Sequence, residues 1–185
     1  MSLSASTLLG IVQDYWPSRE DERQEPGPEA HRLQSLWNQK LQERQSWDVL
    51  LDQMEAAFPH DTVADITATL DACFRCAVYP KNAPGAPASR WVTVGCASII
   101  APVFTMFRLQ FEYGTERIFR QLDREPPLTT EPGRTLSRLM ESNLGASLLP
   151  PAIASVPVPL FVHRKEPFEA TLFDALFTST PERIP

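Results

Sequence analysis

The fold is constrained most by a long alternation of side chains between Thr62 and Tyr113. In residues 103–113 the odd positions read Val, Thr, Phe, Leu, Phe and Tyr, whereas the even positions read Phe, Met, Arg, Gln and Glu. Residues 66–79 and 91–100 also alternate. Such alternation is typical of a strand with one buried face. We therefore expect three long antiparallel strands at the centre of the fold, the first running from Thr62 to Tyr79.

Apolar residues at helical spacing predict further elements around this sheet. Residues 4–16 and 131–144 carry apolar side chains three and four positions apart, and Gly145 is a typical helix end. Residues 29–58 contain neither proline nor glycine, but their apolar stripe changes phase near residues 44–46. This segment is therefore either two helices or one helix that bends.

The proline-rich remainder leaves more alternatives open. Residues 116–122 fit either a fourth, edge strand or a helical turn. Residues 152–163 are predicted as an extended edge strand, because Pro157 and Pro159 cannot donate ladder hydrogen bonds. Residues 168–178 fit a helix or a strand, and we favour a last strand buried in the sheet. These elements predict an α+β fold with an antiparallel sheet of about four to six strands, packed with helices mainly on one face.

The domain organisation follows from one polar stretch. Residues 17–28 have almost no apolar content and contain three prolines, which is typical of a solvated linker. We therefore expect a short helix plus linker over residues 1–28 and a single α+β domain over residues 29–185.

Charge and hydropathy exclude several kinds of partner. The net charge is −6 and there is no run of Lys and Arg, which argues against a nucleic-acid partner. No apolar run approaches the roughly 20 residues that a membrane-spanning helix needs. The first residues lack the basic start of a secretion signal, and the three cysteines cannot all pair. A cytoplasmic protein with reduced thiols is the expectation.

The chain shows no recognisable catalytic or metal-binding signature. Cys73 and Cys76 form a CxxC, but residues three apart on a strand point to opposite faces, so their sulfurs should not meet. A zinc site needs about four ligands, and only Cys96 remains. The histidines, His31 and His60 among them, lie in unrelated contexts. We predict no cofactor, no metal and no enzymatic activity.

One face of the predicted sheet has the composition of a protein-binding surface. Aromatic residues, Met and Arg are enriched in such surfaces. Alternation places these types together on the face opposite the expected core, and the candidate partner-binding residues are Asp71, Arg75, Tyr79, Trp91, Phe104, Met106, Arg108 and Glu112. The competing interpretation is that helices cover this face, which would make its large apolar residues ordinary core.

Three segments carry a resemblance to a known family. The sequences DACFRCAVYP, WVTVGCASIIAPVFTMF and LFDALFT resemble a group of paralogous immunity proteins of myxobacteria, which accompany polymorphic toxins used between sibling cells. The resemblance covers about residues 46–178 and rests on structural motifs. It implies a cytoplasmic protein that binds and neutralises a cognate toxin, without assigning any toxin-contacting residue.

These observations rank three functions. A toxin-binding immunity protein comes first, and its acidic charge would speed capture of a basic toxin. A structural or regulatory protein that uses the same face to form a homodimer comes second. An enzyme comes third, because it would need a pocket with perturbed ionisable groups, and the sequence shows no candidate constellation.

Overall fold

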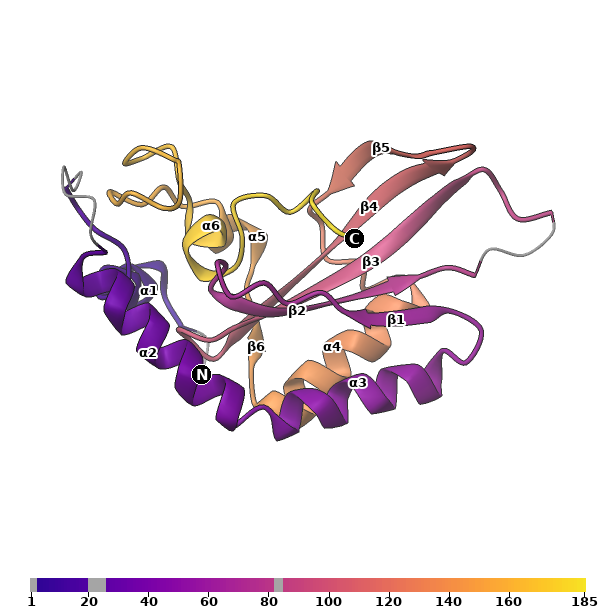
Figure 1. The fold of residues 1–185 in the computed structure, drawn as a ribbon, viewed down its shortest axis with the longest axis horizontal. Coiled ribbons are helices and arrows are strands. Elements are labelled where there is room, and N and C mark those ends of the chain that lie inside the picture. Colours follow the sequence, from indigo (N-terminus) through magenta and orange to yellow (C-terminus); the bar gives the residue numbers. More distant parts are fainter. Residues whose placement is uncertain (1–2, 20–25, 82–84) are drawn as a thin grey trace.

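In the part of the chain that the structure describes, the centre of the molecule is a sheet of six strands in the order β1-β2-β3-β4-β5, with β6 paired to β4. The computed structural model describes residues 3–19, 26–81 and 85–185. Neighbours from β1 to β5 are antiparallel, and β6 is parallel to β4. Helices surround this sheet (Figure 1), which confirms the α+β prediction. The strands are β1 Thr62–Asp65, β2 Cys73–Tyr79, β3 Ser89–Ser98, β4 Val103–Tyr113, β5 Arg117–Asp123 and β6 Ser147–Leu148.

Long helices cover one face of the sheet. Helices α3 (Gln45–Ala57) and α4 (Glu131–Leu144) lie beneath the strands in Figure 1, and α2 (Pro28–Gln42) leads into α3. Their apolar stripes join the even-numbered residues of β2 and β4 in one core cluster. The phase change near residue 44 is the boundary between α2 and α3, so the segment forms two helices.

The opposite face is covered by short helices and loops. Helices α1 (Ala5–Val12), α5 (Pro151–Ala154) and α6 (Leu172–Leu176) form a second core cluster with the odd-numbered residues of β2 and β4. Helix α1 is part of this core, since Leu8 and Val12 are fully buried. The predicted division at residue 28 stays a prediction, and residues 20–25 of the predicted linker lie outside the described residues.

The expected first strand is in fact a hairpin. The chain turns at residues 66–72, so β1 runs antiparallel to β2, with Thr62 opposite Tyr79. Polar side chains hold the turn: Thr67 N donates to Asp65 Oδ1 at 3.0 Å, and Arg75 N donates to Thr67 Oγ1 at 2.9 Å. Short Asp and Thr side chains favour such turns by bonding to nearby backbone.

The two C-terminal strand predictions are wrong. The first three residues of the predicted edge strand 152–163 belong to α5, which begins at Pro151, and the residues after α5 make only isolated bridges. Residues 168–178 contain α6, which begins with a capping box between Thr171 and Asp174. This short helix is buried on every side, and its sequence therefore lacks the polar face that marks an amphipathic helix.

Candidate binding surface

The sheet register divides the eight predicted surface residues between two faces. Gly95 lies opposite both Cys76 and Met106, so the even-numbered residues of β2 share a face with those of β4. Arg75 lies opposite Cys96 and belongs to the other face. The prediction of one common face is therefore wrong. Alternation fixes the two sides of each strand, whereas pairing between strands decides which sides coincide, and the sequence pattern does not reveal that pairing.

Phe104 and Met106 lie in the core and cannot contact a partner. Both side chains are fully buried in the cluster formed with α3 and α4. Helix α4 comes this close because β3 carries a glycine here: a Cβ on Gly95 would lie 2.5 Å from Leu136 Cδ2. The structure therefore supports the competing interpretation for Phe104 and Met106, because helices cover both residues.

Asp71, Arg75 and Tyr79 lie on the opposite face, beneath the end of the chain. Asp71 is 8% exposed and Arg75 5% exposed. Arg75 Nη2 donates to the carbonyl of Arg183 at 3.2 Å, and Tyr79 Oη donates to the carbonyl of Pro185 at 3.0 Å. Arg75 and Tyr79 therefore bind the chain's own C-terminal segment in this structure, whereas Asp71 lies beside Arg75, with its Oδ2 3.8 Å from Arg75 Nη2.

The remaining predicted residues form a half-exposed group at the free end of the sheet. Trp91, Arg108 and Glu112 share the face of α4. The Arg108 guanidinium carbon lies 4.7 Å from the centre of the Trp91 ring, and Arg120 Nε donates to Glu112 Oε2 at 2.7 Å. We call this the sheet-end patch, and it comprises Ser89, Trp91, Arg108, Gln110, Glu112, Ile118 and Arg120.

Ion pairs and hydrogen bonds hold side chains of the sheet-end patch in place in the free protein. Arg108 Nη2 lies 2.6 Å from Asp123 Oδ2, and the hydrogen bond from Arg108 lowers the pKa of the Asp123 carboxyl. Gln110 Nε2 donates to Ser89 Oγ at 2.8 Å across the strands. Because side chains that are already ordered lose little entropy on association, such a patch is suited to binding a protein surface.

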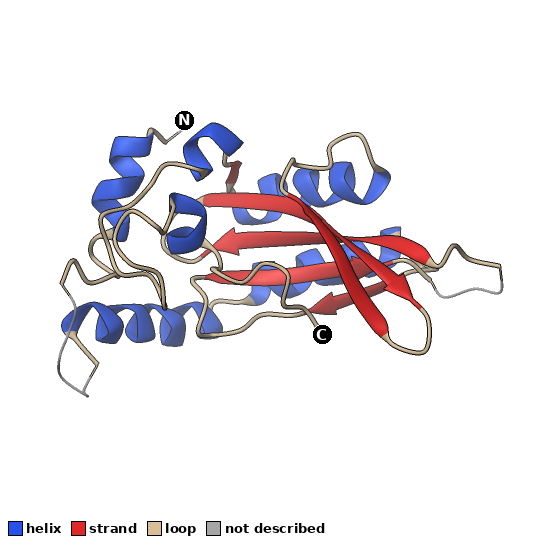
Figure 2. Cartoon of the chain, turned by 90° about the horizontal axis from the view of Figure 1, so that it is seen from above, coloured by secondary structure: helices blue, strands red, loops and turns tan. Residues whose placement is uncertain are grey.

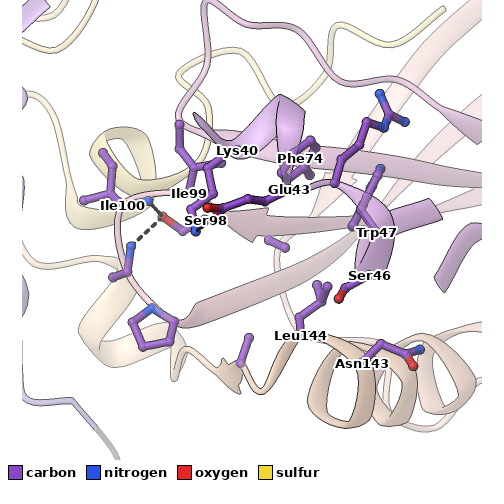
Figure 3. A pocket seen from close by; sticks show the side chains of 15 residues that line it. Lys40, Glu43, Ser46, Trp47, Phe74, Ser98, Ile99, Ile100, Asn143 and Leu144 are labelled. Atoms are coloured by element: carbon purple, nitrogen blue, oxygen red, sulfur yellow. Dashed lines mark hydrogen bonds and ion pairs between the residues drawn. The ribbon is translucent and has the colours of Figure 1, made fainter. Parts of the chain in front are cut away.

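A cavity at the other end of the sheet is a second candidate site. It has a volume of about 390 Å³ and lies between the α2–α3 junction, the β3–β4 turn and the end of α4. Figure 3 shows Ser98 and Ile100 on one side of it and Ser46 and Leu144 on the other. Ser98 Oγ closes the turn by accepting from the backbone N–H groups of Ile100 and Ala101.

The cavity has an apolar floor and a charged rim whose charges are already paired. Trp47 and Phe74 stack at 5.4 Å in its lining. Lys40 lies 3.7 Å from Glu43, and Arg44 binds Asp48. The volume is in the range of ligand sites, but the paired charges identify no ligand class. Residues from four separate segments line the cavity, and no sequence motif could have predicted it.

The three cysteines are buried, and raised thiol pKa values make Cys73 and Cys76 poor nucleophiles. Cys73 and Cys76 belong to different core clusters, so their sulfurs lie on opposite faces as predicted. Burial raises the pKa of the Cys76 thiol to about 12 and that of Cys73 well above its usual value. Within the described residues, no group of three or more His, Cys, Asp or Glu side chains could hold a metal ion.

Comparisons of the chain with protein-family models, curated proteins and solved structures give no match. Among the described residues, no helix combines the length and the apolar character that crossing a bilayer requires.

Proposed function

We propose that this chain is a non-catalytic protein-binding module that binds and neutralises a cognate bacterial toxin, and that the sheet-end patch makes the contact. The observation that carries the proposal is the half-exposed Trp91–Arg108 pair, held by Asp123 at the free end of the sheet. Trp and Arg side chains dominate the binding energy of protein interfaces, particularly where neighbouring contacts keep them ordered.

The toxin as partner rests on the resemblance of residues 46–178 to immunity proteins. Net charge supports it in one respect, because a chain of charge −6 attracts a basic toxin from a distance and raises the association rate. Inhibition of this kind needs a rigid complementary surface and no catalytic group.

A homodimer is the alternative, and the edge strand β5 favours it. Ile118 is 47% exposed and Phe119 40% exposed, on opposite faces of this strand. Edge strands can pair with a second copy of themselves. A register shift between Gln110 and Phe111 disturbs the β4–β5 pairing, and such irregularities are also a device that prevents edge pairing. Light scattering separates the two functions, since only the alternative requires a dimer of this chain alone.

The decisive test is a rescue assay with binding variants. The neighbouring reading frame is expressed under tight control in a bacterial host, with and without this chain. We expect the neighbour to stop growth alone, growth to return with this chain, and a complex to co-purify. Arg108→Glu should weaken the complex about tenfold or more, because it removes the guanidinium that packs on Trp91 and places a carboxylate beside Asp123, which disorders the patch.

Two further variants locate the contact. Arg32→Glu changes an ion-paired arginine of α2 and should bind normally. Arg44→Glu lies at the cavity and should also bind normally. Loss of binding with Arg44→Glu but not with Arg108→Glu would move the contact to the cavity. A neighbour that is harmless, or that kills in the presence of this chain, would contradict the toxin proposal itself.

A further inference from the structure

The last residues of the chain lie on the sheet face opposite α4: Figure 1 places the C-terminus above the strands and α4 below them, and Figure 2 shows the C-terminal loop from above. We call residues 179–185 the tail segment. Pro181 is buried and Ile184 is 9% exposed, whereas Glu182 and Arg183 between them are exposed. Arg183 N donates to the Thr180 carbonyl at 3.1 Å, which closes a turn with proline at its second position. Proline favours this position because its φ is already set. The tail segment therefore presents two apolar anchors from a proline turn.

Side chains of the sheet bind the tail segment by its backbone. Arg117 Nη2 donates to the Ile184 carbonyl at 2.8 Å, and Arg117 Nη1 donates to the Pro185 carbonyl. Arg75 and Tyr79 bind the carbonyls of residues 183 and 185. The Arg117 guanidinium itself lies over the Phe111 ring at 4.7 Å. We call the side chains of Arg75, Tyr79, Phe111 and Arg117 the tail groove.

Recognition of this kind does not depend on the identity of most side chains in the occupant. All four hydrogen bonds end on backbone oxygens: two on the peptide carbonyls of Arg183 and Ile184, which every peptide possesses, and two on the oxygen of Pro185, the last residue of the sequence. Selectivity comes only from the two buried anchors. The backbone bonds described for the tail segment lie within it, so it is not a strand of the sheet. Side-chain donors therefore hold the tail segment in place of a backbone ladder, and a separate peptide of the same conformation would present the same oxygens to them.

The tail segment also leaves donors of the tail groove unused. Arg75 Nε and Nη1 are buried without a hydrogen-bond partner. Asp71 Oδ2 lies 3.8 Å from Arg75 Nη2, which is too long for a hydrogen bond. Buried guanidinium donors normally have acceptors. An occupant with one more carbonyl or carboxylate oxygen at this point would satisfy the tail groove better than the chain's own residues do.

From these contacts we infer that the tail groove is a peptide-binding site, closed in this structure by the tail segment. Its ligand is a segment of a protein partner with a proline turn and an aliphatic residue three positions after the proline. The tail segment acts as an internal competitor at an effective concentration on the order of millimolar, so a partner must displace it. The inference is independent of the toxin and of the sheet-end patch, which lies on the other face.

The test uses the full-length chain and a fluorescent peptide of residues 179–185, amidated at its C-terminus. In the Ile184→Asp variant the tail segment loses an anchor, and the tail groove should open. Peptide binding, measured by fluorescence anisotropy, should be at least about tenfold tighter for Ile184→Asp than for the wild type. In the wild type, only the fraction of molecules whose tail segment has left the tail groove can bind the peptide. Ile184→Ser serves as a milder second variant, and circular dichroism verifies folding of both.

A matched pair of arginines on β5 shows where the peptide binds. Adding Arg117→Ala to Ile184→Asp should abolish peptide binding, because it removes two of the four donors. Adding Arg120→Ala should leave binding unchanged, since this arginine binds Glu112 on the other face. Equal binding by wild type and Ile184→Asp, no binding by the folded variants, or equal loss with both arginine substitutions would overturn the inference.

Discussion

At the scale of single residues, two glycines fix how closely α4 approaches its neighbours. A Cβ on Gly95 would meet the ends of two flexible side chains, Leu136 at 2.5 Å and Met140 at 2.7 Å. A Cβ on Gly133 would lie 2.0 Å from the backbone oxygen of Pro127. Side-chain ends can move within a core at moderate cost, whereas a backbone carbonyl in a tight turn cannot. The two sites should therefore differ in how they tolerate an added methyl group.

Alanine substitutions at three glycines give an ordered prediction. Gly133→Ala should be the most destabilising, by about 3 kcal/mol or more, and Gly95→Ala should cost about 1–3 kcal/mol. Gly10→Ala should stabilise the protein by about 0.5–1 kcal/mol, because α1 has open space there and alanine favours helix. Urea unfolding at constant pH measures all three, and a smaller cost at residue 133 than at residue 95 would contradict the packing argument.

At the scale of elements, the short helix α6 depends on one buried carboxylate. Asp174 is 1% exposed. One of its oxygens accepts from Thr171 N at 2.8 Å and the other accepts from Lys165 Nζ at 2.8 Å. A helix of five residues gains little from its own hydrogen bonds, so its cap and its packing decide whether it forms.

Asp174→Ala should therefore destabilise the protein by about 2–3 kcal/mol, since it removes a cap and one partner of a partly buried ion pair. Thermal unfolding monitored by circular dichroism measures the change. Glu131→Ala is the matched control: this residue is also acidic and lies in the first turn of α4, but its ion pair with Arg134 is exposed. An equal fall in melting temperature for both variants would show that the buried cap is not what matters.

The elements differ in how far the sequence alone predicts them, and the reason is local. Helix α4 runs over the predicted residues 131–144 and ends at Gly145 with φ +60°. The features that predict this helix, its apolar spacing and the glycine at its end, lie within its own sequence. The capping box of α6 is equally local, but residues 172–177 are apolar on both sides of an extended chain, and that pattern favours a strand buried in the sheet. The candidate site could not be predicted to the same extent, because which sides of β2 and β3 coincide depends on their pairing.

At the scale of the whole molecule, one cluster joins segments from both ends of the chain to the sheet. His163 packs against Trp16 with ring centres 4.8 Å apart, and its Nε2 lies 3.8 Å from Asp71 Oδ1. Burial lowers the pKa of His163, opposed by Asp71 and Asp174 and reinforced by Lys165. Burial raises the pKa of the Asp71 carboxyl, and Arg75 opposes that shift.

The two shifts act on stability in opposite directions. An unfolded chain binds a proton at His163 near pH 6.5, and the folded chain does so only at lower pH. Stability from this group is therefore present above pH 6.5 and is lost as the pH falls toward the folded pKa. The pKa of Asp71 is higher in the folded chain than its usual 3.8. Stability from this group is therefore present below pH 3.8 and is lost as the pH rises toward the folded pKa, which is the reverse of the effect of His163.

His163→Asn should therefore flatten the pH dependence between pH 7.5 and 5.5. Asparagine is chosen because residue 163 has φ +55°, a conformation that it tolerates. The wild type should lose melting temperature as the pH falls across this range, and the variant should lose less. His31→Asn, on the exposed side of α2, is the control and should keep the wild-type slope. Identical slopes for His163→Asn and wild type would contradict the assignment.

The burial of all three thiols makes this protein a convenient substrate for site-specific labelling. Cys73, Cys76 and Cys96 are each 0% exposed, and a thiol reacts with maleimides only as an accessible thiolate. The folded chain should take up no maleimide, so a single cysteine introduced on its surface would carry one fluorophore at one known position. A dye on the sheet-end patch and another on the tail segment, in separate preparations, would report directly which of them a partner covers.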